Sequence, residues 1–136
     1  MIGRRPHYPS LGINAEASVS LHSLEGTVVS ASIERYRPRQ GDTGMDFLRE
    51  VLSVAGITPW FTTHPTLGEQ LVDLHGLNRP TPYGYTMLVQ TGHGEWGMEP
   101  LQESISSIPA SQIRSISILE QEYDPGMGPE YGGEEE

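Results

Sequence analysis

Two stretches of alternating apolar and polar residues near the start of the chain constrain its fold most. In the first, Val19 and Leu21 alternate with serine and histidine, and in the second the apolar residues recur at every other position from Val29 to Ile33. A period of two places such side chains on one face of a strand. The segment 23–26 between the stretches has the composition of a turn. The sequence therefore predicts a β-hairpin over residues 17–36, with one face in a core.

The hairpin is followed by a segment with helical spacing. Apolar residues recur at i, i+3, i+4 and i+7 over residues 42–55, and Asp42 or Thr43 can cap the first turn. Gly56 can end the helix. We expect a helix over 42–55, and the short segment 57–63 that follows it has no clear pattern.

A second helix is predicted over residues 66–76. Thr66 and Glu69 have the spacing of a capping box, in which each side chain pairs with a backbone N–H group of the other residue. Three leucines then recur three or four residues apart, and Gly76 supplies a stop.

Three further strands are predicted in the second half of the chain. The first is Tyr85–Gln90, whose apolar and β-branched residues indicate an interior position, followed by a short return between Trp96 and Leu101 and a last strand from Ile113 to near Glu122. The order of strands, helices and strands predicts an α+β fold, with a small mixed sheet and a helix packed across one face.

The predicted elements define one domain, over residues 17–122. Residues 1–16 are punctuated by proline and glycine and predict an irregular arm. Residues 123–136 are rich in glycine, proline and glutamate and predict a flexible acidic tail.

Composition excludes several classes of function for this chain of 136 residues. The formal net charge is −10, which disfavours nucleic acid and anionic membrane surfaces as partners. There is no long apolar run and no signal-peptide pattern, so we expect a soluble, cytoplasmic protein. Cysteine is absent, which excludes disulfides, thiolate metal sites and a cysteine nucleophile in this chain. All eight basic residues are arginine, and lysine is absent.

We expect no metal, no cofactor and no catalysis from these residues. The one histidine and aspartate set that merits a test as a metal site consists of His64, Asp73, His75 and His93. On the predicted helix, Asp73 and His75 would point about 200° apart and could not share an ion. The glycine-rich segment 92–97 lacks lysine and does not open a helix, so it predicts a turn and not a phosphate site. No Gly-x-Ser-x-Gly motif is present.

The acidic tail contains a diglycine, Gly132-Gly133, preceded by Tyr131 and followed by Glu134 and two further glutamates. Glycine lacks a Cβ, so an extended diglycine can enter a narrow channel of an adenylating enzyme or a peptidase. A short acidic end would then have to be removed. A disordered acidic end with no such role is the alternative explanation.

Taken together, these features resemble the bacterial ubiquitin-like modifiers of the β-grasp fold. The resemblance is carried by residues 66–78, 85–90, 96–101 and 113–119, which match the order of the family's helix and last three strands. Either the helix over 42–55 is the β-grasp helix and residues 57–84 are an insertion, or the helix over 66–76 takes that place. The second alternative is favoured here.

The resemblance implies a function in protein conjugation. A JAB-type peptidase would remove residues 134–136, an E1-like enzyme would adenylate the Gly133 carboxylate, and an E2-like enzyme would pass it to a target protein. The processing residues would be Gly132, Gly133 and Glu134, and Tyr131, Tyr85 and Trp96 would contact the partners. Without lysine, the chain offers no side-chain amine for further conjugation.

A second class of function fits the same composition. An acidic, compact α+β domain without an enzyme motif suits an inhibitor, an immunity-type protein or a virion component that binds a basic partner through its folded surface.

Overall fold

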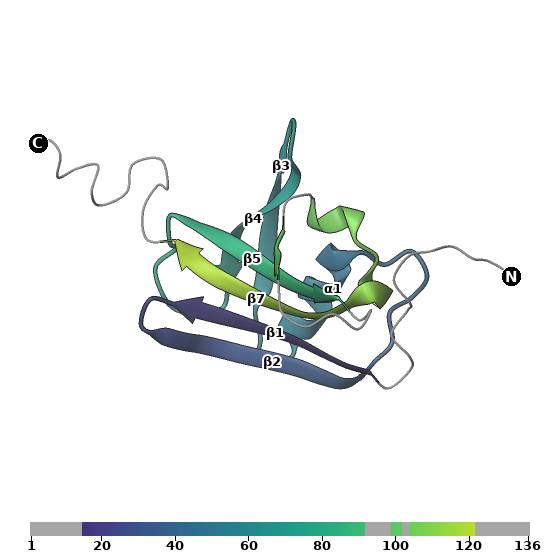
Figure 1. Cartoon of the computed structure of the whole chain (residues 1–136). Coiled ribbons are helices and arrows are strands. Elements are labelled where there is room, and N and C mark those ends of the chain that lie inside the picture. Colours follow the sequence, from purple (N-terminus) through teal and green to yellow (C-terminus); the bar gives the residue numbers. More distant parts are fainter. Residues whose placement is uncertain (1–14, 92–98, 102–103, 122–136) are drawn as a thin grey trace, which may run out of the picture.

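The computed structural model describes residues 15–91, 99–101 and 104–121. Its elements follow in the order β1 (Ala15–Ser23), β2 (Gly26–Tyr36), α1 (Gly44–Ser53), β3 (Thr58–His64), β4 (Gly68–His75), β5 (Gly84–Thr91), β6 (Glu99–Pro100), the 3₁₀ turns η1 (Ile105–Ser107) and η2 (Ala110–Gln112), and β7 (Ile113–Gln121). The fold is α+β (Figure 1). The predictions for residues 1–14, 92–98, 102–103 and 122–136 lie outside the described residues. Ala15 and Glu16, which were expected in the irregular arm, belong to β1.

A mixed sheet has the strand order β2-β1-β7-β5-β6. The pair β1 and β7 is parallel, and the other neighbours are antiparallel. The predicted hairpin over 17–36 is therefore confirmed as β1 and β2, and the predicted last strand is β7. The strand predicted at 85–90 is β5, which lies inside the sheet between β7 and the two-residue β6.

The helix predicted over 42–55 is confirmed as α1, and Thr43 is its N-cap. The Thr43 hydroxyl accepts from the backbone N–H of Met45, and the Asp46 carboxylate accepts from the backbone N–H of Thr43 at 2.9 Å. Gly56, just beyond the helix, has a φ of 77°. The apolar stripe of α1 is fully buried and packs in the core with the inward residues of β1 and β7. The stripe consists of Phe47, Leu48, Val51 and Leu52.

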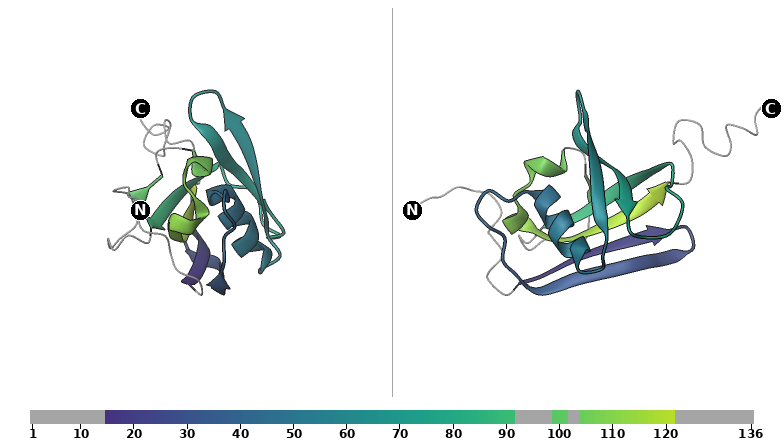
Figure 2. Two further views of the ribbon diagram at one scale, coloured as in Figure 1. Left: turned by 90° about the vertical axis from the view of Figure 1, so that its right-hand side faces the viewer. Right: turned by 180° about the vertical axis from the view of Figure 1, so that it is seen from behind.

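The second predicted helix, over 66–76, is wrong: these residues form a turn and strand β4. β4 pairs with β3 in a separate two-stranded antiparallel sheet, so the unassigned segment 57–63 is also mostly strand. The β3–β4 hairpin lies on the same face of the main sheet as α1, and its tip projects from the body of the protein (Figures 1 and 2). The helix that packs on the sheet is therefore the earlier of the two predicted.

A β-bulge explains why β4 resembles a helix in sequence. Trp60 lies opposite Asp73, but Phe61 lies opposite Leu71, so Val72 is an extra residue on β4. The bulge returns Leu71 and Leu74 to the same buried side although they are three residues apart. Such spacing is otherwise typical of a helix.

The predicted capping box does not form either. Gly68 has a φ of 79°, and a Cβ placed on it would meet Ser104 at 2.5 Å. The Glu69 carboxylate accepts hydrogen bonds from the Ser104 and Ser106 hydroxyls, at 2.9 and 2.7 Å. These bonds attach the start of β4 to the η1 turn.

The Tyr36 hydroxyl identifies a position where the core can be improved. Tyr36 is 2% exposed and packs edge-to-face on Phe47, yet its hydroxyl has no hydrogen-bond partner among the described residues. A buried hydroxyl without a partner costs free energy. We expect Tyr36→Phe to raise the free energy of unfolding by about 1 kcal/mol, as measured by urea denaturation. A loss of similar size would instead show that the hydroxyl is hydrogen-bonded in solution.

Candidate functional site: the outer face of the β3–β4 hairpin

The β3–β4 hairpin has an inner face that joins the core and an outer face turned to solvent. Pro59, Leu71 and Leu74 are buried on the inner side. In the register of the hairpin, Pro59 pairs with Leu74 and Phe61 pairs with Leu71. Trp60 and Asp73 form the pair between these two, so strand alternation directs their side chains outward. We call the surface formed by Trp60, Val72, Asp73 and His75 the outer face of the hairpin.

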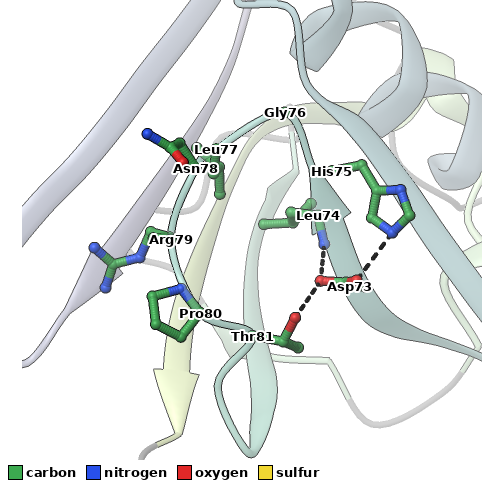
Figure 3. Close-up of a pocket in the computed structure, with 9 residues that line it drawn as sticks. All are labelled: Asp73, Leu74, His75, Gly76, Leu77, Asn78, Arg79, Pro80 and Thr81. Carbon is green, nitrogen blue, oxygen red and sulfur yellow. Dashed lines mark hydrogen bonds and ion pairs between the residues drawn. The ribbon is translucent and has the colours of Figure 1, made fainter.

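Asp73 organises the polar part of this face (Figure 3). Its Oδ1 atom accepts hydrogen bonds from the Leu74 backbone N–H at 2.8 Å and the Thr81 hydroxyl at 3.0 Å. Its Oδ2 atom lies 2.9 Å from Nε2 of His75. The carboxylate thus connects β4 to the loop that follows it and fixes the orientation of the imidazole.

Trp60 is held against one face of that imidazole. Its ring stacks on His75 with a centroid distance of 4.5 Å and an interplanar angle of 25°. Even so, 53% of Trp60 is exposed, and the bulge residue Val72 is 43% exposed. A large aromatic ring is therefore presented to solvent in an orientation that His75 and Asp73 support.

The electrostatics of the face favour an ionised carboxylate. Desolvation raises the pKa of Asp73, but the hydrogen bonds from Leu74 and Thr81 and the nearby His75 outweigh it, so the pKa lies below its ordinary value. The hydrogen bonds from Ser106 and Ser104 likewise lower the pKa of Glu69 at the start of β4. The hairpin contains no arginine and no lysine between residues 58 and 75.

These shifts predict how the protein responds to acid. A carboxyl group whose pKa is lowered by folding adds stability that is complete above its unfolded pKa and is lost as the pH falls through the folded value. The ordinary pKa of Asp73 is 3.8. We expect wild type to melt at a higher temperature than Asp73→Asn at neutral pH, and the difference to shrink only below about pH 4. A difference that persists unchanged in stronger acid would contradict this assignment.

The arrangement of Thr81, Asp73 and His75 is not that of a nucleophile and its base. In such a site the hydroxyl must lie next to the imidazole that takes its proton. Here the hydroxyl and the imidazole bind different oxygen atoms of the carboxylate, which stands between them (Figure 3). The hollow of about 630 Å³ beside them, lined by residues 73–81, is wide open to solvent. This geometry is suited to recognition.

The structure corrects the argument about part of the proposed metal set, while His93 lies outside the described residues. Asp73 and His75 are two apart on a strand and not on a helix, so they face each other, and the argument that they point apart is wrong. His64 lies at the far end of β3, where Nδ1 accepts from the backbone N–H groups of Thr66 and Leu67. Within the described ranges, no three histidine, cysteine or acidic residues are grouped to hold a metal ion.

The other predicted site residues are only partly described. Tyr85 lies on β5, and burial together with the charges of Asp73 and Glu120 raises its pKa to about 12. It also lines a smaller hollow of about 270 Å³ between β4 and β5. The structure does not describe Trp96, Tyr131, Gly132, Gly133 or Glu134, so their proposed roles stay predictions.

The sequence patterns did not identify Trp60 as a candidate binding residue. It lies in the segment 57–63, which has no clear period, and the side of a strand on which a residue lies depends on the pairing register. The available indication was that Thr58 and Thr62, two residues away on either side of Trp60, are polar.

Comparisons with known proteins do not assign the chain to a family. No protein-family model matches the chain, and no match to it is found among curated proteins. In the part of the chain that the structure describes, no helix combines the length and apolar character needed to span a bilayer.

Proposed function

We propose that this chain is a β-grasp protein that acts by binding a partner protein through its folded surface, with the outer face of the β3–β4 hairpin as the binding surface. The sheet order, the parallel pairing of β1 with β7 and the packing of α1 across one face support a β-grasp core. In this scheme α1 is the β-grasp helix, and the hairpin is an insertion between it and β5.

The exposed Trp60 carries this proposal. Tryptophan is among the residues most enriched in binding hot spots, where a rigid ring enters a pocket of the partner. The stack on His75 and the hydrogen bonds of Asp73 hold the Trp60 ring in place before binding. The side chain therefore loses less conformational entropy when the partner binds. The net charge of −10 favours a basic partner, as expected for an inhibitor, an immunity-type protein or a virion component.

Conjugation as a ubiquitin-like modifier is the second candidate, and a specific observation favours it. β7, the last strand described, ends at Gln121, and the chain continues to Gly132-Gly133. The absence of lysine also suits a modifier that accepts no copies of itself on a side chain. The helix predicted over 66–76, which carried part of the resemblance, is absent, and this weakens the candidate relative to binding.

For the second candidate, a JAB-type peptidase would expose the Gly133 carboxylate, and E1-like and E2-like enzymes would transfer it to a target protein. Incubation of the chain shortened to end at Gly133 with ATP and an E1-like enzyme encoded beside the protein would then give an adduct. The adduct should disappear when Gly133 is replaced by alanine.

Two variants separate the candidates in the cells that make the protein. One lacks residues 124–136, and the other is Trp60→Ala. If binding is the function, the truncated chain still elutes in the same complex as wild type in size-exclusion chromatography, and Trp60→Ala elutes as the free chain. If the truncated chain loses adducts that survive denaturation while Trp60→Ala keeps them, the binding proposal is wrong and conjugation is favoured.

A further inference from the structure

The β3–β4 hairpin combines an exposed aromatic ring and a carboxylate with a lack of strong cations. Arg49 approaches the hairpin, but it lies over Phe61, 5.3 Å from the ring centroid, and Phe61 packs against the core. Arg79, in the loop after β4, makes a bidentate ion pair with Glu120. Each of these guanidinium groups thus has a partner other than Trp60 and Asp73.

We propose that the outer face of the hairpin binds an arginine side chain of the partner protein, stacked on the indole face of Trp60 that His75 leaves open and attracted by the Asp73 carboxylate. This inference rests on the proposed function and specifies the chemistry of the partner. His75 covers one face of the indole ring, so the guanidinium would occupy the other.

The physical chemistry of the face favours arginine over other side chains. A cation over the face of tryptophan is attracted by the negative quadrupole of the ring, and tryptophan is the strongest of the aromatic residues in this respect. The guanidinium is planar and weakly hydrated, so it stacks on a ring at a smaller desolvation cost than the ammonium of lysine. Asp73 is held ionised and lies opposite Trp60 in the strand register, so its charge attracts a cation that stacks on the ring.

A carbohydrate is the other ligand that stacks on exposed tryptophan, but the surroundings of Trp60 favour it less. Sugar recognition needs polar groups beside the ring that are free to bind hydroxyls. The Oδ1 atom of Asp73 already accepts from Leu74 and Thr81, and Nε2 of His75 is engaged with Oδ2. Charge distinguishes the two ligands as well, since a neutral sugar gains nothing from a chain of net charge −10.

The test is a titration of the full ¹⁵N-labelled chain with blocked pentapeptides that differ only at the central residue, which is Arg, Lys, Gln or Glu. At about pH 8, where histidine side chains are ordinarily neutral, the Arg peptide should shift the Trp60 indole N–H and the Asp73 and His75 amides. The Lys peptide should bind several-fold more weakly, and the Gln and Glu peptides should cause no shift there. A soluble glucan oligosaccharide is titrated in parallel.

Variants locate the effect. Trp60→Ala should weaken binding of the Arg peptide about tenfold, and Trp60→Phe and Asp73→Asn by smaller factors. Leu24→Ala is the matched control: Leu24 is 77% exposed in the β1–β2 turn and should have no effect. Because Trp60→Phe retains a ring, it keeps the test valid if Trp60→Ala destabilises the hairpin.

Three results would overturn the inference. They are equal shifts with the Arg and Gln peptides, shifts spread over other acidic residues and unaffected by Trp60→Phe, and shifts on the hairpin only with the glucan. If Trp60→Ala dissociates the cellular complex but the Arg peptide causes no shifts on the hairpin, the proposed binding surface is retained and the proposed arginine ligand is wrong. If the complex survives Trp60→Ala, the proposed function itself fails.

Discussion

Replacing Gly76 with alanine is expected to lower the free energy of unfolding by about 3 kcal/mol or more. Gly76 directly follows β4 and has a φ of 105°, a conformation that residues with side chains rarely adopt. A Cβ at this position would also collide with the backbone carbonyl oxygen of Gly56, and a carbonyl group in a turn cannot rotate away as a side chain can. The backbone approach between the end of β4 and the turn after α1 therefore requires glycine.

Gly56→Ala is the control for this prediction. Gly56 also has a positive φ, of 77°, but a Cβ there would meet nothing within 4 Å. Gly56→Ala should lower the free energy of unfolding only by the cost of a side chain in the left-handed backbone conformation, about 1–2 kcal/mol. Urea denaturation of both variants measures the difference. Equal losses for the two would show that the close approach at Gly76 does not exist.

The second large effect is expected from Arg79→Met. The guanidinium donates from Nε to Oε2 of Glu120 at 2.9 Å and from Nη2 to Oε1 at 2.8 Å, while the Glu120 side chain is only 3% exposed. Removing the cation leaves a buried carboxylate without compensation, which costs about 3 kcal/mol. The pair attaches the loop after β4 to β7, so local hydrogen exchange in that loop should increase as well.

Two further variants complete this test by chemical denaturation. Arg49→Met removes an exposed guanidinium that rests on Phe61 and should cost no more than about 1 kcal/mol. Combining Arg79→Met with Glu120→Leu should recover much of the stability, because no buried charge is left unpaired. The ion pair would be refuted as a structural element if Arg79→Met were as mild as Arg49→Met.

Local sequence patterns predicted the elements whose signals are local. The alternation in β1 and β2 and the cap and apolar stripe of α1 are each complete within a short segment, and these elements form as expected. The order of strands in the sheet, including the parallel pairing of β1 with β7, depends on contacts between distant segments. No pattern in either strand specifies its neighbour.

The segment 66–76 shows where local patterns fail. The bulge at Val72 gives β4 a helical spacing of leucines, and Glu69 has its partners, Ser104 and Ser106, in a distant turn. The same error misplaced Asp73 and His75, which a strand brings together and a helix would separate. The exposure of Trp60 follows from this pairing, so the candidate site could not be recognised before β3 and β4 were placed.

The central claim is that the protein functions by binding through the outer face of the hairpin. The most direct measurement is photo-crosslinking in the cells that make the protein, with a benzophenone amino acid in place of Thr62, next but one to Trp60 on β3, or of Leu24 as control. We expect one light-dependent protein adduct from position 62, none from position 24, and the same adduct when residues 124–136 are removed. Equal adducts from both positions, or an adduct that forms without light and requires residues 124–136, would contradict it.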